Sequence, residues 1–353
     1  MPIKVLVIDD SALMRALLTE IIGGAADLKV VGAAPDPIAA RDMIKSLNPD
    51  VLTLDIEMPK MNGLEFLDRL MRLRPMPVVM ISSLTKSGSE VTMQALEMGA
   101  VDFIAKPRME NVSLLESYAD EIRDKIRTAY GARLKAGLRV VPGQAAAAPL
   151  RTGGTPLSRR VLEDKLIAIG ASTGGTEAIK AVLKDLPQEV PGIVMVQHMP
   201  ESFTASFAAR LDSLSRVTVI EAKGGERILP GHAYLAPGHS HLLVKRSGNG
   251  YVTELAQSEP VNRHRPAVDV LFRSVAQHVR GNAIGVILTG MGKDGAQGML
   301  EMRQAGAWNI GQDQDSCVVY GMPREAAQVG AVEEVAPLNQ IAERIMQRLR
   351  GGA

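Results

Sequence analysis

A segment without hydrophobic periodicity divides this 353-residue chain in two. Between Gly131 and Arg160 the sequence consists largely of Ala, Gly, Pro, Thr and Arg, with few large apolar residues. Such a composition cannot build a packed core and is typical of a flexible linker. The flanking segments, about 130 and about 190 residues long, are each long enough for one domain. The sequence therefore predicts two domains, residues 1–130 and 161–353, joined by a linker over residues 131–160.

The segment before the linker alternates between apolar runs of strand length and stretches of helical periodicity. In the first expected helix Leu13, Leu17 and Ile21 share one face, and Ser11 stands where an N-terminal cap belongs. This alternation predicts a doubly wound α/β domain with a parallel, flavodoxin-like sheet. The expected strands are residues 3–8, 28–33, 51–54, 78–81 and 101–105, and the later helices are residues 63–73, 90–98 and 113–127.

The segment after the linker also alternates between strands and helices. An amphipathic pattern near the C-terminus predicts a closing helix, and Gly248, Asn249 and Gly250 predict the turn of a hairpin. We therefore expect a second doubly wound α/β domain with a mostly parallel sheet. The expected strands are residues 166–169, 193–196, 217–220 and 284–288, with extra strands at Tyr234, 242–244 and 252–255 and the closing helix at 338–349.

Composition and charge exclude several classes of protein. Lys and Arg total 40 against 39 Asp and Glu, so the chain lacks the basic surplus that bulk attraction to nucleic acid or an anionic membrane requires. No apolar run approaches the roughly 20 residues that span a bilayer. A single cysteine, Cys317, excludes an internal disulfide framework. We expect a cytoplasmic, monomeric protein without membrane insertion and without a nucleic-acid partner.

Polar side chains follow four of the five strands expected in the first domain. Asp9 and Asp10 end the first strand, Asp55 the third, Ser82 the fourth and Lys106 the fifth. Because the carboxyl ends of parallel strands meet at one edge of a sheet, these side chains should converge. Mg²⁺ would relieve the repulsion between the carboxylates, Asp55 could attack a phosphoryl group, and Lys106 could stabilise its charge. The alternative is that these are ordinary polar loop residues.

The same strand ends carry a resemblance to a known family. They stand in the strings Ile8-Asp9-Asp10-Ser11, Leu54-Asp55-Ile56-Glu57-Met58-Pro59, Asn62-Gly63, Ile81-Ser82-Ser83 and Ala105-Lys106-Pro107. With them the first domain resembles the receiver domains of response regulators. The resemblance implies that Asp55 is the phosphorylated residue and that a sensor histidine kinase supplies the phosphoryl group.

The receiver resemblance also implies a cofactor and a switch. Ser82 would be the switch hydroxyl and Phe103 the aromatic residue that changes rotamer with it, while Lys106 contacts the phosphorylated site. The cofactor would be Mg²⁺, held by Asp9, Asp10, Asp55 and the backbone carbonyl of Glu57.

A possible nucleophilic serine lies in the second domain. Gly170, Ser172 and Gly174 form a G-x-S-x-G pattern between an expected strand and a helix, which would expose the serine hydroxyl beside helix N-terminal amides. Glycine-rich turns of this kind also bind phosphate, so the pattern alone leaves both readings open. His198 and Asp294 follow two other strands, and a base and an orienting carboxylate there would complete a triad. The chain order Ser, His, Asp differs from the Ser, Asp, His order of α/β-hydrolases.

Two other polar loops are less specific. Asn262, Arg263 and His264 lie in a basic loop that either lines a cleft for an anionic or amide-rich substrate or is simply solvated, and both alternatives remain open. His239 and His241 flank Ser240, but no further metal ligands stand at a recognisable spacing.

Together the two domains resemble the chemotaxis response-regulator protein-glutamate methylesterases, the CheB family. The resemblance covers both domains and leaves out only the linker, and the presumed catalytic positions show no departure from it. In the second domain it is carried by Ile169-Gly170-Ala171-Ser172-Thr173-Gly174-Gly175, Gln197-His198-Met199-Pro200, Pro260-Val261-Asn262-Arg263-His264-Arg265-Pro266 and Leu288-Thr289-Gly290-Met291-Gly292-Lys293-Asp294-Gly295.

This resemblance implies a phosphorylation-regulated hydrolase. It would remove methyl groups from glutamate γ-methyl esters, and deamidate selected glutamines, on the cytoplasmic helices of chemoreceptors, to whose arrays it is recruited. Ser172 would be the nucleophile, His198 the general base and acid, and Asp294 the orienting carboxylate. The Met291 amide is the candidate oxyanion donor, and the esterase step would need no cofactor.

Two other classes of function fit less well. A transcriptional response regulator would need a helical DNA-binding output domain with a basic face, whereas the second domain reads as α/β without a basic surplus. A nucleotide-binding module would favour an acidic residue at the end of the strand after the glycine turn. Gln197 and His198 occupy that strand end instead.

Overall fold

The computed structural model describes residues 1–58, 61–83, 85–106, 113–133 and 156–351. The chain divides into two compact units, Met1–Arg139 and Val140–Ala353. Most of the predicted linker, residues 134–155, lies outside the described residues, so its extent stays a prediction. On either side of the predicted linker, helix α5 ends at Gly131 and helix α6 begins at Arg159. The hydroxyl of Ser158 caps α6 by accepting a hydrogen bond from the Val161 amide.

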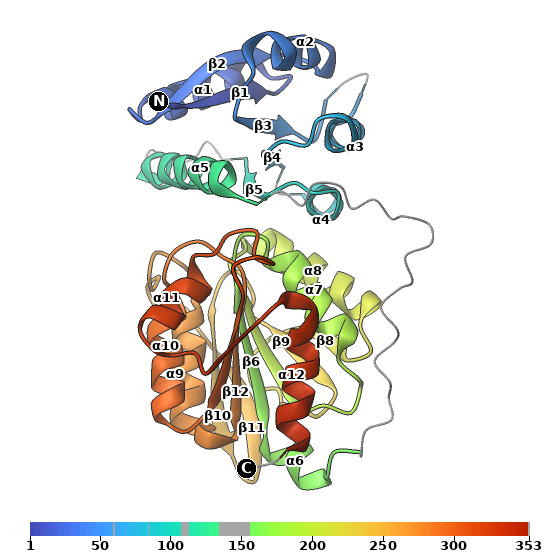
Figure 1. The fold of residues 1–353 in the computed structure, drawn as a ribbon, viewed down its shortest axis with the longest axis vertical. Coiled ribbons are helices and arrows are strands. Elements are labelled where there is room, and N and C mark those ends of the chain that lie inside the picture. The colour runs from blue at the N-terminus through green and yellow to red at the C-terminus, as the bar shows by residue number, and fades with distance from the viewer. Residues whose placement is uncertain (59–60, 84, 107–112, 134–155, 352–353) are drawn as a thin grey trace. The chain divides into compact units, whose positions relative to one another are not determined.

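The first unit is built on a five-stranded sheet in the order β2-β1-β3-β4-β5, with every pair parallel. This order confirms the predicted flavodoxin-like sheet. Helices cover both faces, α1 and α5 on one and α2, α3 and α4 on the other (Figure 1). The strands are β1 (Ile3–Ile8), β2 (Leu28–Ala34), β3 (Val51–Asp55), β4 (Val78–Ser82) and β5 (Asp102–Ala105), and the helices are α1 (Ala12–Gly23), α2 (Pro37–Leu47), α3 (Gly63–Leu73), α4 (Lys86–Glu97) and α5 (Ser113–Gly131).

Capping residues explain where several helices of this unit begin. Ser11 caps α1 as predicted, because its hydroxyl accepts a hydrogen bond from the Met14 amide. Helix α2 was not among the expected helices, although Asp36 followed by Pro37 is a strong start signal. Helix α4 begins at Lys86 rather than at residue 90, because Thr85 accepts from the Gly88 amide and caps it earlier.

The second unit contains a seven-stranded parallel sheet in the order β14-β13-β12-β6-β7-β9-β8. The predicted hairpin is present as a separate antiparallel pair, β10 and β11. The strands are β6 (Leu166–Ala171), β7 (Gly192–Gln197), β8 (Thr218–Glu221), β9 (His232–Leu235), β10 (His241–Ser247), β11 (Gly250–Ala256), β12 (Ala283–Ile287), β13 (Trp308–Gln312) and β14 (Glu334–Ala336). The helices are α6 (Arg159–Asp164), α7 (Gly175–Asp185), α8 (Glu201–Leu214), α9 (Val268–His278), α10 (Ala296–Gln304), α11 (Met322–Gln328) and α12 (Leu338–Arg350), with a 3-10 turn at Arg280–Asn282.

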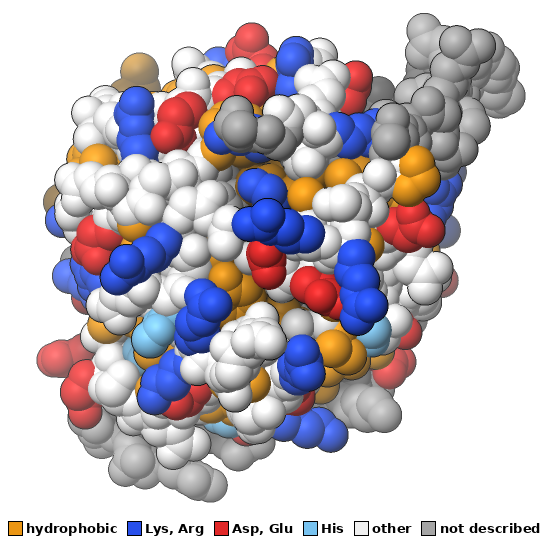
Figure 2. Space-filling view, turned by 90° about the horizontal axis from the view of Figure 1, so that it is seen from below, with side chains coloured by type: hydrophobic (Ala, Val, Ile, Leu, Met, Phe, Trp, Pro, Cys, Tyr) orange, Lys and Arg blue, Asp and Glu red, His pale blue; other side chains and the backbone are white. Residues whose placement is uncertain are grey.

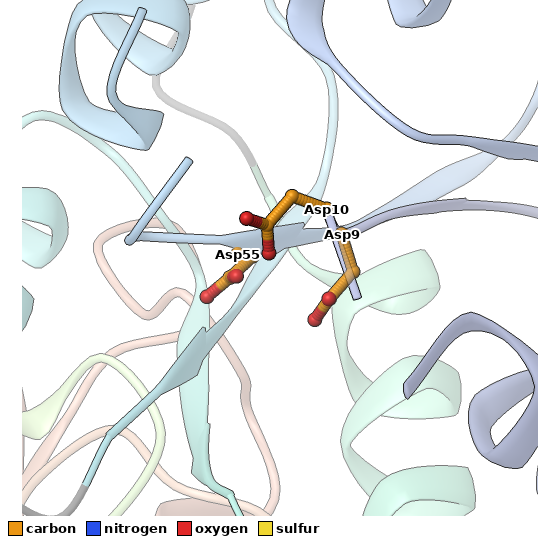
Figure 3. A group of neighbouring side chains, drawn as sticks. All are labelled: Asp9, Asp10 and Asp55. Carbon is orange, nitrogen blue, oxygen red and sulfur yellow. The ribbon is translucent and has the colours of Figure 1, made fainter. Parts of the chain in front are cut away.

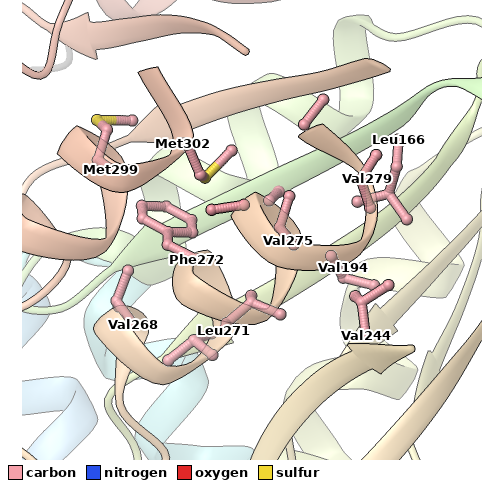
Figure 4. Close-up of a cluster of buried hydrophobic side chains, with 14 of the residues drawn as sticks. Leu166, Val194, Val244, Val268, Leu271, Phe272, Val275, Val279, Met299 and Met302 are labelled. Atoms are coloured by element: carbon pink, nitrogen blue, oxygen red, sulfur yellow. The ribbon is translucent and has the colours of Figure 1, made fainter. Parts of the chain in front are cut away.

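Helix α9 forms the centre of the larger core. It lies with α10 and α11 on one face of the sheet, while α7, α8 and α12 cover the other (Figure 1). Its buried side chains, among them Phe272 and Val275, pack against strand residues and against Met299 and Met302 of α10 (Figure 4). Close approach to β6 requires Gly170, because a Cβ there would overlap with the Val268 side chain and lie 3.2 Å from Phe272 Cζ.

The surface agrees with the balanced charge of the sequence. Figure 2 shows one face of the molecule, and among its described residues Lys and Arg side chains are intermixed with those of Asp and Glu. None of the helices that the structure describes is long and apolar enough to cross a membrane.

We predict that Phe272→Ala destabilises the second unit by about 3–5 kcal/mol, because it removes a fully buried ring and leaves a cavity. Chemical denaturation, with a spectroscopic signal from the second unit, measures the change in its free energy of unfolding. Val329→Ala, at an exposed position in the same unit, should change its stability by less than about 0.5 kcal/mol. Equal effects of the two substitutions would contradict this description of the core.

Candidate functional site

Strand order brings Ser172, His198 and Asp294 to one edge of the larger sheet. Strands β12, β6 and β7 are neighbours, and all three run parallel. Ser172 and His198 directly follow Ala171 and Gln197, which are paired in the register of β6 and β7. Asp294 lies in the loop after β12, two residues before α10 begins. Parallel pairing therefore places three residues from distant parts of the chain together.

Ser172 occupies a tight turn between β6 and α7. Its amide donates to the carbonyl of Thr289 at 3.0 Å, and its own carbonyl accepts from the Gly175 amide at 2.7 Å. Gly174 has a left-handed backbone (φ 77°), which a residue without a Cβ adopts at little cost. A Cβ at Gly175 would overlap with the side-chain oxygen of Gln197. Gly174 of the predicted pattern and Gly175 next to it are thus required for separate structural reasons.

His198 and Asp294 form a buried ion-pairing contact. The His198 Nε2 atom lies 2.8 Å from Asp294 Oδ2, and the two side chains are 7% and 2% exposed. Burial raises the pKa of the Asp294 carboxyl, but hydrogen bonds from His198, Asn262 and the Val268 amide outweigh it and bring the pKa to about 2. Asp294 is therefore an ionised acceptor at neutral pH.

The partner of Nε2 decides which nitrogen of His198 can act as a base. An ionised carboxylate only accepts hydrogen bonds, so the Nε2 atom facing Asp294 carries the proton. Nδ1 then holds the lone pair, and it is buried without a hydrogen-bond partner among the residues that the structure describes. Among the described residues no hydrogen bond joins the Ser172 hydroxyl to His198. The site thus contains a buried, unpaired base at the edge of the sheet where Ser172 lies.

The loop before α9 contacts this pair directly. The side-chain amide of Asn262 donates to Asp294 Oδ1 at 2.8 Å and to Asp269 Oδ2 at 2.9 Å. The His264 ring stacks on the His198 ring, with the centroids 3.8 Å apart and an interplanar angle of 15°. Arg263 between them is exposed. The structure brings two of the three predicted loop residues to the candidate triad, and their predicted role in substrate binding stays a prediction.

Gly290 places the Met291 segment against the serine. A Cβ at Gly290 would lie 2.8 Å from Ser172 Cβ and 3.1 Å from the Ser172 nitrogen. The side chain of Met291, the next residue, is 39% exposed. Its amide is therefore in the segment next to the nucleophile, and its role as an oxyanion donor stays a prediction.

Two residues of the site were missed by the sequence reasoning. Gln197 is buried, and its amide donates to the carbonyl of Ser172 at 2.9 Å and to that of His198 at 3.2 Å. Asp269 is also buried and accepts from the Gly298 amide at 2.7 Å. Their signals were weak: Gln197 directly precedes His198 at a strand end, and Asp269 is an acidic residue within an apolar helix pattern.

The second candidate site lies at the strand ends of the first unit. Carboxylate oxygens of Asp9, Asp10 and Asp55 all lie within 4.8 Å of one another (Figure 3). Asp9 and Asp55 are buried, whereas Asp10 is exposed. The Lys106 ammonium lies 2.8 Å from Asp55 Oδ2 and 3.7 Å from Asp9 Oδ2. Four of the five side chains that were expected to converge, those of Asp9, Asp10, Asp55 and Lys106, therefore lie together.

The electrostatics of this cluster suit a divalent cation. Burial raises the pKa of the Asp55 carboxyl to about 6, even though Lys106 lowers it. Burial likewise raises the pKa of Asp9, whose Oδ2 atom is buried and has no hydrogen-bond partner in the described part of the chain. Hard carboxylate oxygens short of donors are the ligands that Mg²⁺ prefers, so the residues present fit such an ion.

The predicted switch residues lie on two other strands of the same sheet, Ser82 at the end of β4 and Phe103 on β5. The Ser82 hydroxyl is 2.6 Å from the hydroxyl of Thr92 on α4, and Phe103 is buried. The Glu57 amide donates to Asp55 Oδ1 at 3.3 Å, which places the Glu57 backbone beside the carboxylates. Pro59 and Pro107 of the receiver strings lie outside the described residues.

These features define a class of protein: a receiver-type α/β domain followed by an α/β domain with a serine elbow and a histidine–aspartate pair. Residues 5–117 match the response regulator receiver domain, and residues 167–345 match CheB methylesterase. The chain belongs to the CheB methylesterase family. It is a protein-glutamate methylesterase/protein-glutamine glutaminase with a receiver domain.

Similar proteins cover the whole chain. A protein-glutamate methylesterase/protein-glutamine glutaminase of Nitrosomonas europaea is 64% identical over 349 residues, which are 99% of this chain and 97% of that protein. One from Methylobacillus flagellatus is 62% identical over 349 residues, with 99% and 97% covered. The Thermotoga maritima CheB methylesterase catalytic domain, known from a crystal structure, is 41% identical in sequence and matches with a TM-score of 0.51. The match covers 52% of this chain and 97% of that one.

We predict that Gly290→Ala lowers methylesterase activity by about 10- to 100-fold. The new Cβ would overlap with Met322 Sδ and lie 2.8 Å from Ser172 Cβ, so it forces the segment and the serine apart. Methanol release measures the loss. Gly250→Ala is the matched control, since its Cβ would meet Arg227 atoms no closer than 3.6 Å. Wild-type activity of Gly290→Ala would contradict the close packing of this segment on the serine.

Proposed function

We propose that Ser172, His198 and Asp294 form a catalytic triad that demethylates glutamate γ-methyl esters and deamidates selected glutamines on the cytoplasmic helices of chemoreceptors. The observation that carries the proposal is the buried His198–Asp294 pair, whose Nδ1 atom has no partner, beside a serine on an adjacent strand end. Membership in the CheB methylesterase family supports the substrate class.

In the proposed acylation step, the Ser172 oxygen attacks the ester carbonyl carbon and His198 Nδ1 takes the hydroxyl proton. Asp294 stabilises the resulting imidazolium from the opposite nitrogen. The negative charge on the tetrahedral intermediate is held by backbone amides, with Met291 as the candidate donor. Collapse of the intermediate breaks the ester bond, and His198 returns the proton to the leaving methoxide, which departs as methanol.

Deacylation reverses these roles. His198 takes a proton from water, which attacks the Ser172 ester, and then returns it to the serine oxygen. The products are a glutamate carboxylate and the free enzyme. With glutamine as substrate the amide C–N bond breaks in place of the ester C–O bond, and the protonated leaving group is ammonia in place of methanol. One site therefore serves both reactions without a cofactor.

The receiver domain is proposed to accept a phosphoryl group on Asp55 from the sensor histidine kinase of a chemotaxis pathway. Mg²⁺, when bound, would neutralise charge on the phosphoryl oxygens. Lys106, which contacts Asp55, would stabilise the same charge. The residues proposed to hold the ion are Asp9, Asp10 and Asp55 through their carboxylates and Glu57 through its backbone carbonyl.

Phosphorylation is proposed to regulate the esterase. Ser82 would leave its Thr92 partner and hydrogen-bond the phosphoryl group, and Phe103 would change rotamer with it. Each tenfold of regulation requires only about 1.4 kcal/mol of differential stability between two states. The protein would act in the cytoplasm, recruited to chemoreceptor arrays.

We predict that Ser172→Ala lowers methanol release from methylated receptor membranes by about 10⁴-fold, because the nucleophile is lost. The fold should be preserved, since the hydroxyl lies at a turn. Ser213→Ala, which removes a hydroxyl that donates to the Arg210 carbonyl within α8, should retain full activity. Asp294→Asn should cost less than Ser172→Ala. Near-wild-type methanol release by Ser172→Ala would refute the triad.

For the receiver we predict that Asp55→Asn abolishes labelling by a small-molecule phosphodonor, and that chelation of Mg²⁺ does the same. Asp42→Asn, an exposed carboxylate on α2, is the control that should label normally. The phosphodonor should change methanol release by the wild type and by Asp42→Asn, but not by Asp55→Asn. Acid-stable phosphate on a serine, with none on Asp55, would contradict the proposal.

A further inference from the structure

We propose that the loop containing Asn262 and His264 positions the catalytic pair instead of binding substrate. In this proposal Asn262 is a positioning residue for Asp294, and His264 is a positioning residue for the His198 ring. The proposal rests on the triad proposed above and adds two residues to it. Four observations carry it.

The first observation is the bridge that Asn262 makes between two buried carboxylates. Its amide group has two hydrogens, one directed at Asp294 Oδ1 (2.8 Å) and one at Asp269 Oδ2 (2.9 Å). Asp269 is held in turn by the Gly298 amide at 2.7 Å, and its own amide donates to Asp294 Oδ1 at 3.1 Å. The bridge therefore ties the carboxylate that faces His198 to the first turn of α9.

The second observation is that the backbone is shaped to present this amide. Val261 and His264 exchange two backbone hydrogen bonds, at 3.0 and 2.9 Å, which closes a two-residue turn. Asn262 and Arg263 at its tip both have left-handed backbones, with φ of 53° and 68°. Asparagine tolerates that region better than most residues. The turn thus directs residue 262 towards Asp294 and residue 264 towards His198.

The third observation is a buried histidine that holds both ends of the loop. His241 is fully buried, its Nδ1 accepts from the Ala267 amide at 3.1 Å, and its Nε2 lies 3.1 Å from the Glu259 carbonyl. Because Nδ1 accepts from an amide, Nε2 carries the proton and donates to Glu259. The loop between these two residues is anchored from the core side. A loop fixed at both ends can hold a side chain in place without help from a substrate.

The fourth observation is the stack of His264 on His198. The rings are nearly parallel, at 15°, with centroids 3.8 Å apart. A ring at this distance covers one face of the imidazole and restricts its rotation about the side-chain bonds. His198 must keep Nε2 on Asp294 while Nδ1 exchanges a proton with the serine. Covering its face helps to hold that orientation.

The experiment separates positioning from substrate binding by measuring kcat and KM. Asn262→Gly removes the amide while keeping a residue suited to a left-handed backbone, and His264→Ala removes the stacked ring. If the loop positions the pair, Asn262→Gly lowers kcat by about 10- to 100-fold, the effect of losing a hydrogen bond to a charged group. His264→Ala lowers kcat by about 2- to 10-fold, the effect of losing a stacked ring. Both variants leave KM within about threefold. A rise in KM with unchanged kcat would show that the loop binds substrate and would overturn the proposal.

A spectroscopic readout distinguishes positioning from a general structural role. The proton shared by His198 Nε2 and Asp294 should give a downfield proton resonance in the full-length wild type. In Asn262→Gly this resonance should shift or broaden, while the remaining amide spectrum keeps its dispersion. An unchanged downfield resonance together with unchanged kcat would also overturn the proposal. His264→Phe, which restores a stacking ring, should recover most of the kcat lost in His264→Ala.

Matched controls are available in the same chain. Asn48 also has a left-handed backbone (φ 46°) and caps the C-terminus of α2 in the receiver domain, so Asn48→Gly makes the same chemical change outside the loop and outside the catalytic domain. It should leave kcat and KM unchanged. Ser172→Ala tests the underlying triad separately. If that variant is inactive while the loop variants change only KM, the triad stands and the positioning role fails.

Discussion

Parallel strand pairing is the constraint on which both sites of this protein depend. In each domain the chain leaves the sheet at the carboxyl end of every central strand, so residues that follow neighbouring strands meet at one edge. Ala171 pairs with Gln197, and the next residues are Ser172 and His198. Leu54 pairs with Ile8, and the next residues are Asp55 and Asp9. Sheet register therefore decides which side chains can act together, before any of them makes a hydrogen bond.

Each domain buries a carboxylate at this edge of its sheet, and the pKa values of the two carboxylates shift in opposite directions. Asp294 accepts hydrogen bonds from His198, Asn262 and the amides of Val268 and Asp269, and its pKa falls to about 2 in spite of burial. Asp55 has Lys106 and one backbone amide as donors beside a second carboxylate, and burial raises its pKa to about 6. A carboxylate surrounded by donors is suited to orienting a histidine. One short of donors is suited to a cation or a phosphoryl group.

Much of this could be predicted from local pattern. Alternating apolar runs and amphipathic stretches are properties of neighbouring residues, so the α/β class, the hairpin at Gly248 to Gly250 and the polar strand ends were accessible from the sequence. Helix α2 and the early start of α4 were not predicted, although their caps, Asp36 and Thr85, are signals of a helix start that the sequence contains. Gln197 and Asp269 were missed because a single buried polar residue has no periodic signature.

By itself the sequence determined the α/β class of both domains, the polar residues that end the strands at the two sites and the family that the chain resembles. Only the tertiary structure decided which nitrogen of His198 faces Asp294, and that Asn262 and His264 contact this pair. The physical reason is distance along the chain. His198 and Asp294 are 96 residues apart and Asn262 and Asp294 are 32 apart, so their contacts depend on strand order and loop shape. The pKa of a carboxylate depends on its burial and on the number of hydrogen bonds that it accepts. Both are fixed only once distant segments have packed together.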